Sequence, residues 1–384
     1  MSRVCITSGK CTIDCANLSS PWDRSLGSTE EGRHPMVATR PPTLQDVADR
    51  SGVSRGTASR ALSGGGRVSA ETRARVAAVA AELNFTTNSG ARNLRRARAG
   101  SIGLWLPQGL RFMDYYMNFT FGVVEATNDR ELTVSLIPGD FPPERARSLH
   151  VDGFVMADVD SEDTLARAIL TTGKPVVTSE LVPPGMPEPT ASVMADHAAA
   201  TRLLLDRLRD GGVAKIVVLI PDIDQMWVQA VHEAAAAWSQ EQAIELSFLP
   251  LVGVPSATEL RRIVDGLMAA RPDVDAIVCV PDGLGVGILS TLQELGHAVP
   301  DDIQIVSYVD GATLPIVQPP ISALDLRPRE AGRRAGDLLV SLLEGPPPAA
   351  EAGAVATIVE TFDLAYHERG STRQRGDAAA DQVP

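Results

Sequence analysis

Residues 43–62 read TLQDVADRSGVSRGTASRAL, and this stretch predicts two short helices joined by a tight turn. Thr43 is suited to cap the first helix, in whose first turn Asp46 places negative charge. Apolar residues then recur at helical spacing in both halves, at positions 44, 47, 48, 58, 61 and 62. Gly52 supplies the positive φ that a sharp turn requires, and Ser54 is suited to cap the second helix. The pattern is typical of a helix-turn-helix, whose second helix lies in the DNA major groove.

The second helix carries side chains that can read DNA. Arg55 and Arg60 lie outside the apolar stripe, and arginine can bind guanine O6 and N7 with two hydrogen bonds. Gly56 has no side chain, so one position of this helix that could contact a base offers no such contact. The expected headpiece contacts to DNA are Thr43, Ser54, Arg55, Gly56, Thr57, Ser59 and Arg60. The alternative interpretation is a solvated arginine face on an ordinary helical hairpin.

A third helix and an arginine-rich segment follow. Ser69 begins this helix, Val76, Val79, Ala80 and Leu83 form its core face, and Asn84 ends it in a left-handed conformation. Residues 86–107 then read TTNSGARNLRRARAGSIGLWLP. With TLQDVADRSGVSRGTASRAL, VSAETRARV and ELNF, this run resembles the lactose-repressor (LacI/GalR) family of bacterial transcription regulators.

The resemblance implies a mechanism. In that family a hinge, here residues 88–100, folds only on the operator and adds DNA contacts. The matching positions are Asn88, Ala91, Arg92, Leu94 and Arg95. Leu94 is expected to insert into the minor groove and kink the DNA, although it could instead pack on the core. Two headpieces of a homodimer read a two-fold symmetric operator, and an effector that binds the core gates this binding. Repression is the usual outcome in the family.

Charge is distributed unevenly along the chain. Between residues 40 and 99 eleven arginines stand against four carboxylates, a net charge of +7. Because residues 1–39 are balanced and the whole chain carries −13, residues 100–384 carry −20. A basic head on an acidic body is typical of a DNA-binding module joined to a domain that does not bind DNA.

The first 41 residues show no apolar period, and we expect a disordered extension. Cys5, Cys11 and Cys15 allow a metal site, but their spacing fits no zinc signature, so we expect neither metal nor cofactor. No secretory signal and no membrane span are predicted, which favours a cytoplasmic protein. Met36 is an alternative start of translation.

From residue 101 onward, apolar runs alternate with amphipathic segments. Strands are expected at 102–106, 132–137, 151–157, 175–179, 214–220, 244–249, 274–280, 303–309 and 354–360. Helices are expected at 115–130, 161–172, 196–210, 225–240, 257–270, 284–295 and 328–343. This alternation predicts a doubly wound α/β core, and the number of strands indicates two lobes with a cleft.

The resemblance extends to this core through VDGFVM, GKPVV, DAIVCVPD and ELGHAVPDDIQIVSYVD. It implies an all-α headpiece at 42–87 and a two-lobed α/β core at 101–368 like that of a periplasmic sugar-binding protein. The first lobe is expected to comprise about 101–192 and 325–350, and the second about 193–324 and 351–368. Residues 369–384 are expected to form a disordered tail without the leucine heptads of a tetramer helix.

An effector site is expected in the cleft. Its candidates are Tyr115, Asp158, Glu180, Trp227, Gln229, Asp282 and Asp310. Three positions that often hold polar sugar ligands in relatives carry Gln229, Pro281 and Val309 here, so simple hexoses are expected to bind poorly. Trp227 is expected either to stack on a sugar face or to fill a lobe core, and Asp282 and Asp310 could cap loops. The identity of the effector stays open, although a sugar or sugar derivative is the family's usual one.

An enzyme and a sugar-binding protein are two other functions that a core of this kind can serve. The glycines at 283, 285 and 287 resemble a phosphate loop but lack its acidic partner, so no enzyme is expected. A sugar-binding protein of the same core fold that does not bind DNA is the alternative to a regulator.

Overall fold

A computed structural model describes residues 40, 42–64, 66–85, 98–107, 114–128, 130, 132–345 and 358–373. The chain divides into two compact units, 1–87 and 88–384. The cysteines at 5, 11 and 15, Met36 and the hinge positions 88–97 lie outside the described residues.

The first unit is a three-helix headpiece made of α1 (Leu44–Arg50), α2 (Arg55–Ser63) and α3 (Ala70–Glu82). Its core is small and well closed, with Val47, Ala48, Ala58 and Val76 all 0% exposed. The alanines let the helices approach closely. The predicted turn at Gly52 (φ +66°) and the left-handed Asn84 (φ +50°) are both present.

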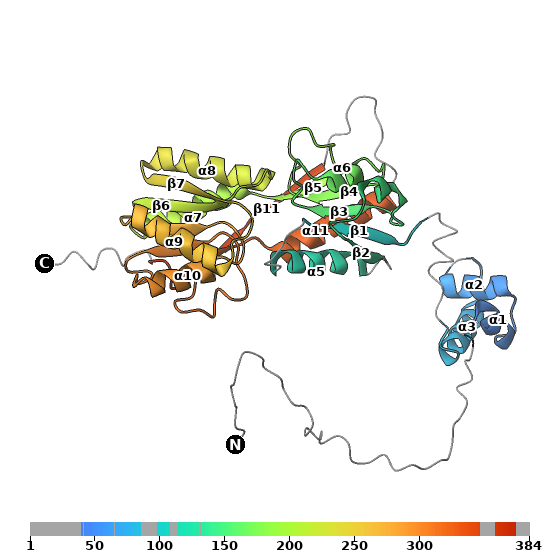
Figure 1. Cartoon of the computed structure of the whole chain (residues 1–384). Helices are drawn as coiled ribbons and strands as arrows, with labels where there is room; N and C mark the ends of the chain where they lie inside the picture. Colours follow the sequence, from blue (N-terminus) through green and yellow to red (C-terminus); the bar gives the residue numbers. More distant parts are fainter. Residues whose placement is uncertain are drawn as a thin grey trace, which may run out of the picture. The chain divides into compact units, whose positions relative to one another are not determined.

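The second unit contains two lobes, each a six-stranded sheet between helices (Figure 1). The first lobe comprises β1 (Ser101–Trp105), α5 (Asp114–Asn128), β2 (Thr133–Ile137), the 3-10 turn η1 (Pro143–Ser148), β3 (Phe154–Ala157), α6 (Thr164–Leu170), β4 (Val176–Ser179), β5 (Ala191–Ala195), α11 (Pro328–Glu344) and β11 (Ile358–Phe362). Its strands are all parallel, in the order β11-β5-β4-β3-β1-β2.

The second lobe comprises α7 (His197–Asp210), β6 (Lys215–Pro221), α8 (Met226–Gln242), β7 (Glu245–Leu251), α9 (Ala257–Ala270), β8 (Ala276–Cys279), α10 (Gly285–Glu294), β9 (Gln304–Ser307), β10 (Ser322–Asp325) and β12 (Ala365–His367). Its strand order is β12-β10-β9-β8-β6-β7, and β12 alone is antiparallel to its neighbour. The predicted doubly wound, two-lobed fold is thereby confirmed.

Helices cover both faces of each sheet. In the first lobe α5 and α11 pack side by side on one face, and α6 packs on the other (Figure 1). Glycines permit the close crossing of α5 and α11. A Cβ at Gly122 would lie 2.1 Å from the Arg329 carbonyl oxygen, and one at Gly332 would lie 2.0 Å from that of Phe119. In the second lobe α7 and α8 cover one face, and α9 and α10 cover the other.

Several expected boundaries were wrong. Residues 351–368 do not all belong to the second lobe, because β11 pairs in parallel with β5 of the first lobe. The strands β5, β10 and β12 were not expected as strands. Their pairing with distant strands places them in the sheets, and β12 has only three residues.

The ends of the core were also misplaced. The expected hinge 88–100 is too long, because the backbone N–H groups of Ala99 and Gly100 donate to the Asp152 carboxylate at 2.7 and 2.8 Å. The expected tail begins too early. Ser371 is 0% exposed, and its hydroxyl donates to the Ile305 carbonyl at 2.6 Å. Residues 369–373 therefore belong to the second lobe.

Candidate DNA-binding surface and effector cavity

The first headpiece helix begins with a reciprocal cap. The Asp46 N–H donates to the Thr43 hydroxyl, and the Asp46 carboxylate accepts from the Thr43 N–H at 2.7 Å and hydroxyl at 2.6 Å. These bonds from Thr43 hold the pKa of Asp46 below its ordinary value. The Thr43 hydroxyl was expected to contact DNA, but here it accepts one hydrogen bond and donates another within the helix cap.

The second headpiece helix exposes the residues expected to read bases. Ser54 caps α2 by accepting from the Thr57 N–H, and the two hydroxyls lie 2.9 Å apart. Arg55, Gly56 and Arg60 are exposed, while Thr57 and Ser59 are half-buried. Within the described part of the chain neither arginine forms an ion pair, so both guanidinium groups are available to a ligand. Asn88, Ala91, Arg92, Leu94 and Arg95, the hinge contacts, lie outside the described residues.

A cavity of about 500 Å³ is lined by residues of both lobes of the second unit. It lies where β3, β4, β8 and β9 end, as ligand sites of doubly wound sheets commonly do. Five of the seven expected effector residues line it: Tyr115, Asp158, Glu180, Trp227 and Asp282. Pro281 and Val309, two of the altered positions, line it too.

Two acidic residues that directly follow first-lobe strands have a left-handed backbone conformation. Asp158 follows β3 at φ +47°, and Glu180 follows β4 at φ +70°. Such conformations are costly for residues other than glycine, and they concentrate at functional sites. Both carboxylates are 6% exposed.

Asp158 is held from both lobes. The Tyr116 hydroxyl donates to its Oδ2 at 2.6 Å, and the Gln225 amide of the second lobe donates to its carbonyl oxygen at 2.8 Å. Burial raises the pKa of Asp158 to about 7, with nearby Glu180 adding to the shift and the Tyr116 bond opposing it. Near neutral pH this carboxyl group therefore changes its charge readily.

Glu180 begins a polar chain that crosses between the lobes. Its Oε1 accepts from the Ala195 N–H at 3.1 Å and lies 3.2 Å from His197 Nε2. The other ring nitrogen of His197 lies 2.9 Å from the Tyr308 hydroxyl. His197 and Tyr308 are both buried, so the chain runs through the wall of the cavity.

Three polar atoms of the cavity wall lack hydrogen-bond partners among the described residues. They are the buried Oδ2 of Asp282, Nε1 of Trp105, whose residue is 1% exposed, and Nε2 of His197, which lies within ion-pair distance of Glu180 but makes no hydrogen bond. Burial raises the pKa of Asp282 to about 6, and the charge of Asp114 adds to the shift. Unpaired buried polar groups are unfavourable, and at a cavity wall a ligand can satisfy them.

Aromatic rings supply the apolar wall. The Trp227 Nε1 donates to the Gln225 side-chain oxygen at 2.7 Å, and its ring lies 6.5 Å from that of Tyr308 at 20°. Trp227 thus packs against the lobe core and also lines the cavity, and its stacking on a sugar face stays a prediction. Tyr115 and Tyr116 meet edge to face at 5.1 Å.

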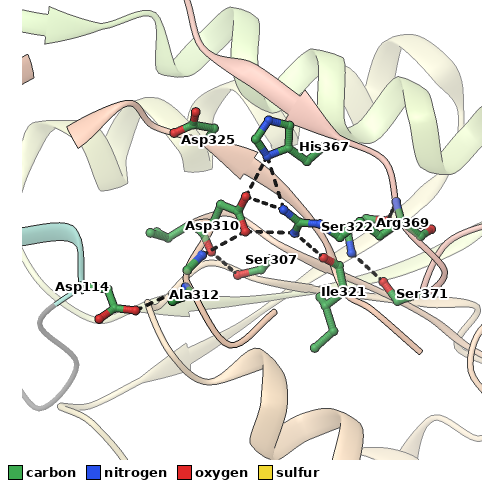
Figure 2. A network of polar contacts seen from close by, with 12 residues as sticks. Asp114, Ser307, Asp310, Ala312, Ile321, Ser322, Asp325, His367, Arg369 and Ser371 are labelled. Atoms are coloured by element: carbon green, nitrogen blue, oxygen red, sulfur yellow. Dashed lines mark hydrogen bonds and ion pairs between the residues drawn. The ribbon is translucent and has the colours of Figure 1, made fainter. Parts of the chain in front are cut away.

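Two expected effector residues do not line the cavity. The Gln229 amide donates to Asp224 at 2.6 Å on the lobe surface. Asp310 turns toward the C-terminal segment, where Arg369 donates to both of its carboxylate oxygens at 2.9 and 2.6 Å (Figure 2). His367 Nδ1 lies 2.7 Å from the same group. Although burial alone would raise it, these bonds hold the pKa of Asp310 below its ordinary value. The role of Asp310 in this structure is to anchor that segment.

Among the wall residues that were not expected from the sequence are Trp105, Tyr116, His197 and Gln225. Trp105 and His197 stand next to strand ends, at the end of β1 and just after β5. That position was the available signal for both. Gln225 and Tyr116 carried no such signal, because their roles depend on Asp158, which is distant in sequence.

No helix in the described segments is long and apolar enough to cross a membrane. Likewise, no grouping of histidine, cysteine and carboxylate side chains suited to a metal ion occurs within those segments.

Two family models match the chain. Residues 43–88 match the model of bacterial regulatory proteins of the lacI family, and residues 205–360 match a periplasmic binding protein-like domain. Among characterised proteins, the chain is 29% identical to the HTH-type transcriptional regulator CelR of Thermobifida fusca, with 81% of this chain and 94% of that protein covered. It is 28% identical to the ribose operon repressor of Bacillus subtilis (strain 168), with 79% and 93% covered.

Solved structures show the same architecture. The lac repressor dimer bound to operator and the anti-inducer ONPF superposes with a TM-score of 0.71 at 21% identity, covering 86% of this chain and 99% of that one. A CelR–cellobiose complex superposes with a TM-score of 0.62 at 23% identity, again covering 86% and 99%. The headpiece, the two-lobed core and these matches agree: the chain joins a helix-turn-helix domain of the lacI family of bacterial regulatory proteins to a periplasmic binding protein-like core.

Proposed function

We propose that this chain is a homodimeric transcriptional repressor of the cytoplasm that binds a two-fold symmetric operator and responds to a sugar-like effector in the interlobe cavity. One observation carries the proposal. The same chain joins a helix-turn-helix that exposes two arginines, neither in an ion pair with a described residue, to a core with a cavity lined by both lobes. The family's members are regulators rather than enzymes. The alternative, a sugar-binding protein that does not bind DNA, would not require a helix-turn-helix headpiece, so the presence of the headpiece argues against it.

A homodimer is supported by the surface of α5. Met117, Phe121 and Val124 recur at helical spacing on that helix and are 41%, 48% and 42% exposed. An exposed apolar stripe of this kind indicates an interaction surface. A second copy is the partner that the DNA geometry requires, since two headpieces must reach two half-sites of one operator.

The effector role is supported by the cavity. Its volume lies within the range of small-molecule sites, and carboxylates and aromatic rings line it. A relative binds cellobiose, so a disaccharide-sized ligand is a reasonable occupant of this cavity. We further propose that the segment 88–98 adds minor-groove contacts and that Leu94 inserts at the centre of the operator.

The test is selection of binding sites from a pool of random duplexes, followed by titration of the selected site. A palindromic consensus bound by a dimer is expected. Leu94→Ala should weaken binding to the full site while half-site contacts persist. Deletion of residues 1–35 serves as the control and should leave affinity unchanged. Recovery of no common sequence by the full-length chain would overturn the proposal.

A further inference from the structure

The cavity wall carries an unbalanced negative charge. Its acidic members are Asp158, Asp160, Glu162, Asp163, Glu180 and Asp282. Among the described lining residues there is no lysine or arginine, and His197 is the only basic side chain. His197 is already paired with Glu180. Arg111, in the neighbouring segment 108–113, lies outside the described residues.

The acidic residues of the cavity differ in the hydrogen bonds and ion pairs that their carboxylates already form. Asp163 caps α6 and Asp160 accepts from the Glu162 N–H, so these two serve their own loop. Asp158 accepts from Tyr116 and forms no ion pair with any described residue, although the charge of His197 is near enough to lower its pKa. Asp282 retains a buried oxygen with no partner among the described residues. Two carboxylates at the cavity therefore form no ion pair within the part of the chain that the structure describes, and burial of an unpaired charge is strongly unfavourable.

Aromatic rings stand beside these carboxylates. Tyr115, Tyr116, Trp105 and Trp227 line the same cavity. Faces of aromatic rings attract cations, most strongly where water is excluded. The unpartnered Trp105 Nε1 is a donor and requires an oxygen acceptor on the ligand. The wall thus suits a molecule that combines a positive charge with hydroxyl oxygens.

Building on the proposed function, we infer that the effector is a cationic, amine-bearing sugar whose ammonium group binds the acidic wall of the cavity, at Asp282. A neutral sugar could donate hydroxyl hydrogens to these carboxylates, but it would leave their charge uncompensated. An ammonium group supplies both the hydrogen bonds and the charge. The raised pKa values of Asp158 and Asp282 are consistent with carboxylates that lack a cation in the empty cavity.

The experiment compares three β-1,4-linked disaccharides that share one skeleton: the glucosamine dimer, its N-acetylated form and cellobiose. Calorimetry on the full chain at pH 7 and low salt is expected to show at least ten-fold tighter binding of the glucosamine dimer than of either neutral sugar. Its affinity should fall as salt is raised. Asp282→Asn should reduce its affinity at least ten-fold and reduce that of the neutral sugars by a clearly smaller factor. Asp301→Asn, which alters an exposed carboxylate outside the cavity, should change neither.

Binding of the ligand-free chain to its selected operator is measured on the same samples. If cellobiose or the N-acetylated dimer binds as tightly as the amine and releases the operator, the inference is wrong and the proposed function stands. Failure of the amine to bind while the operator is still recognised overturns the inference as well. Loss of specific DNA binding instead overturns the proposed function.

Discussion

The Glu180 carboxylate and the His197 imidazole lie 3.2 Å apart, from Oε1 to Nε2, and join the two lobes at the cavity. Glu180 follows β4 of the first lobe, whereas His197 begins α7 of the second. Both side chains are almost fully buried, at 7% and 6% exposure. This pair therefore links the wall of the cavity to a contact between the two lobes.

Removal of one partner should cost more stability than removal of both. His197→Ala leaves the Glu180 carboxylate buried without its partner, which should lower the free energy of unfolding by about 3 kcal/mol. The double variant, which adds Glu180→Gln to His197→Ala, also removes the unpaired charge. It should recover part of the lost free energy of unfolding. Urea unfolding of both single variants and the double variant measures the coupling. Strictly additive losses would show that the pair contributes no coupling energy.

Asp158 should give the stability an unusual dependence on pH. Its pKa is raised from 3.8 to about 7, so between pH 4 and 7 the folded protein holds a proton that the unfolded chain releases. The free energy of unfolding must therefore fall as pH rises through this window. Asp158→Asn removes this contribution while Tyr116 can still donate to the amide oxygen. The groups that face Asp158 are Tyr115, Tyr116, Glu180 and His197, and all are retained in the variant.

Relative to the wild type, Asp158→Asn should gain on the order of 3 kcal/mol between pH 4 and 7 and gain nothing further above pH 7. Thermal unfolding across this range measures the difference. The exposed Asp301→Asn provides the control and should give a flat difference. A gain of the Asp158→Asn variant that appears only below pH 4 would show that Asp158 is an ordinary, ionised aspartate.

The two exposed arginines of α2 should distinguish specific from nonspecific DNA binding. Arg55→Ala and Arg60→Ala should each weaken binding to the selected operator by about 1–3 kcal/mol and relax preference at one base pair. Arg73→Ala, an exposed arginine on α3, should leave base preference unchanged. Binding-site selection repeated with each variant gives the comparison. Equal weakening on every sequence would mean that Arg55 and Arg60 contact only phosphates.

The apolar stripe on α5 should be required for dimerisation. Phe121→Glu places a charge in the middle of the stripe and should raise the dimer dissociation constant at least ten-fold, which corresponds to about 1.4 kcal/mol. Val252→Glu changes a solitary valine that is 85% exposed and should have no effect on association. Sedimentation equilibrium measures both variants. Weaker operator binding by the Phe121→Glu variant, reversed at high protein concentration, is the expected functional consequence.

The elements that local chemistry specifies could be predicted from the sequence. Thr43, Ser54 and Ser69 cap the three headpiece helices as expected, because capping depends on residues only three positions away. Buried parallel strands such as β6 were predicted from continuous apolar runs. By contrast, β12 has only three residues, and its pairing with β10 depends on a segment about forty residues earlier in the chain.

The effector residues show the same limit. Asp282 and Asp310 both follow parallel strands and could not be told apart by pattern. Asp282 lines the cavity, whereas Asp310 binds Arg369, which lies 59 residues later in the chain. A sequence pattern identifies the strand ends at which a site forms. The partner that captures each side chain is decided by tertiary contacts.

The bond between Asp310 and Arg369 should hold the C-terminal segment on the second lobe. The two side chains are 15% and 16% exposed, and Arg369 also donates to the Ile321 carbonyl at 2.6 Å (Figure 2). Arg369→Met keeps most of the side-chain stem but leaves the Asp310 carboxylate without its main partner, which should cost about 3 kcal/mol of stability. His367→Gln is the matched control. That side chain is 46% exposed, so its loss should cost less than about 1 kcal/mol. Urea unfolding at pH 7, with hydrogen exchange of residues 365–373, measures both variants.

The pH dependence gives this prediction a second readout. The pKa of Asp310 is held below its ordinary 3.8, so its contribution is present above about pH 4 and is lost as pH falls through the folded pKa. The stability difference between wild type and Arg369→Met should therefore shrink in acid, opposite in sign to the trend expected from Asp158. If His367→Gln proves as destabilising as Arg369→Met, the imidazole rather than the guanidinium anchors the segment. If neither variant accelerates exchange in residues 365–373, the backbone pairing of β12 with β10 is sufficient to hold it.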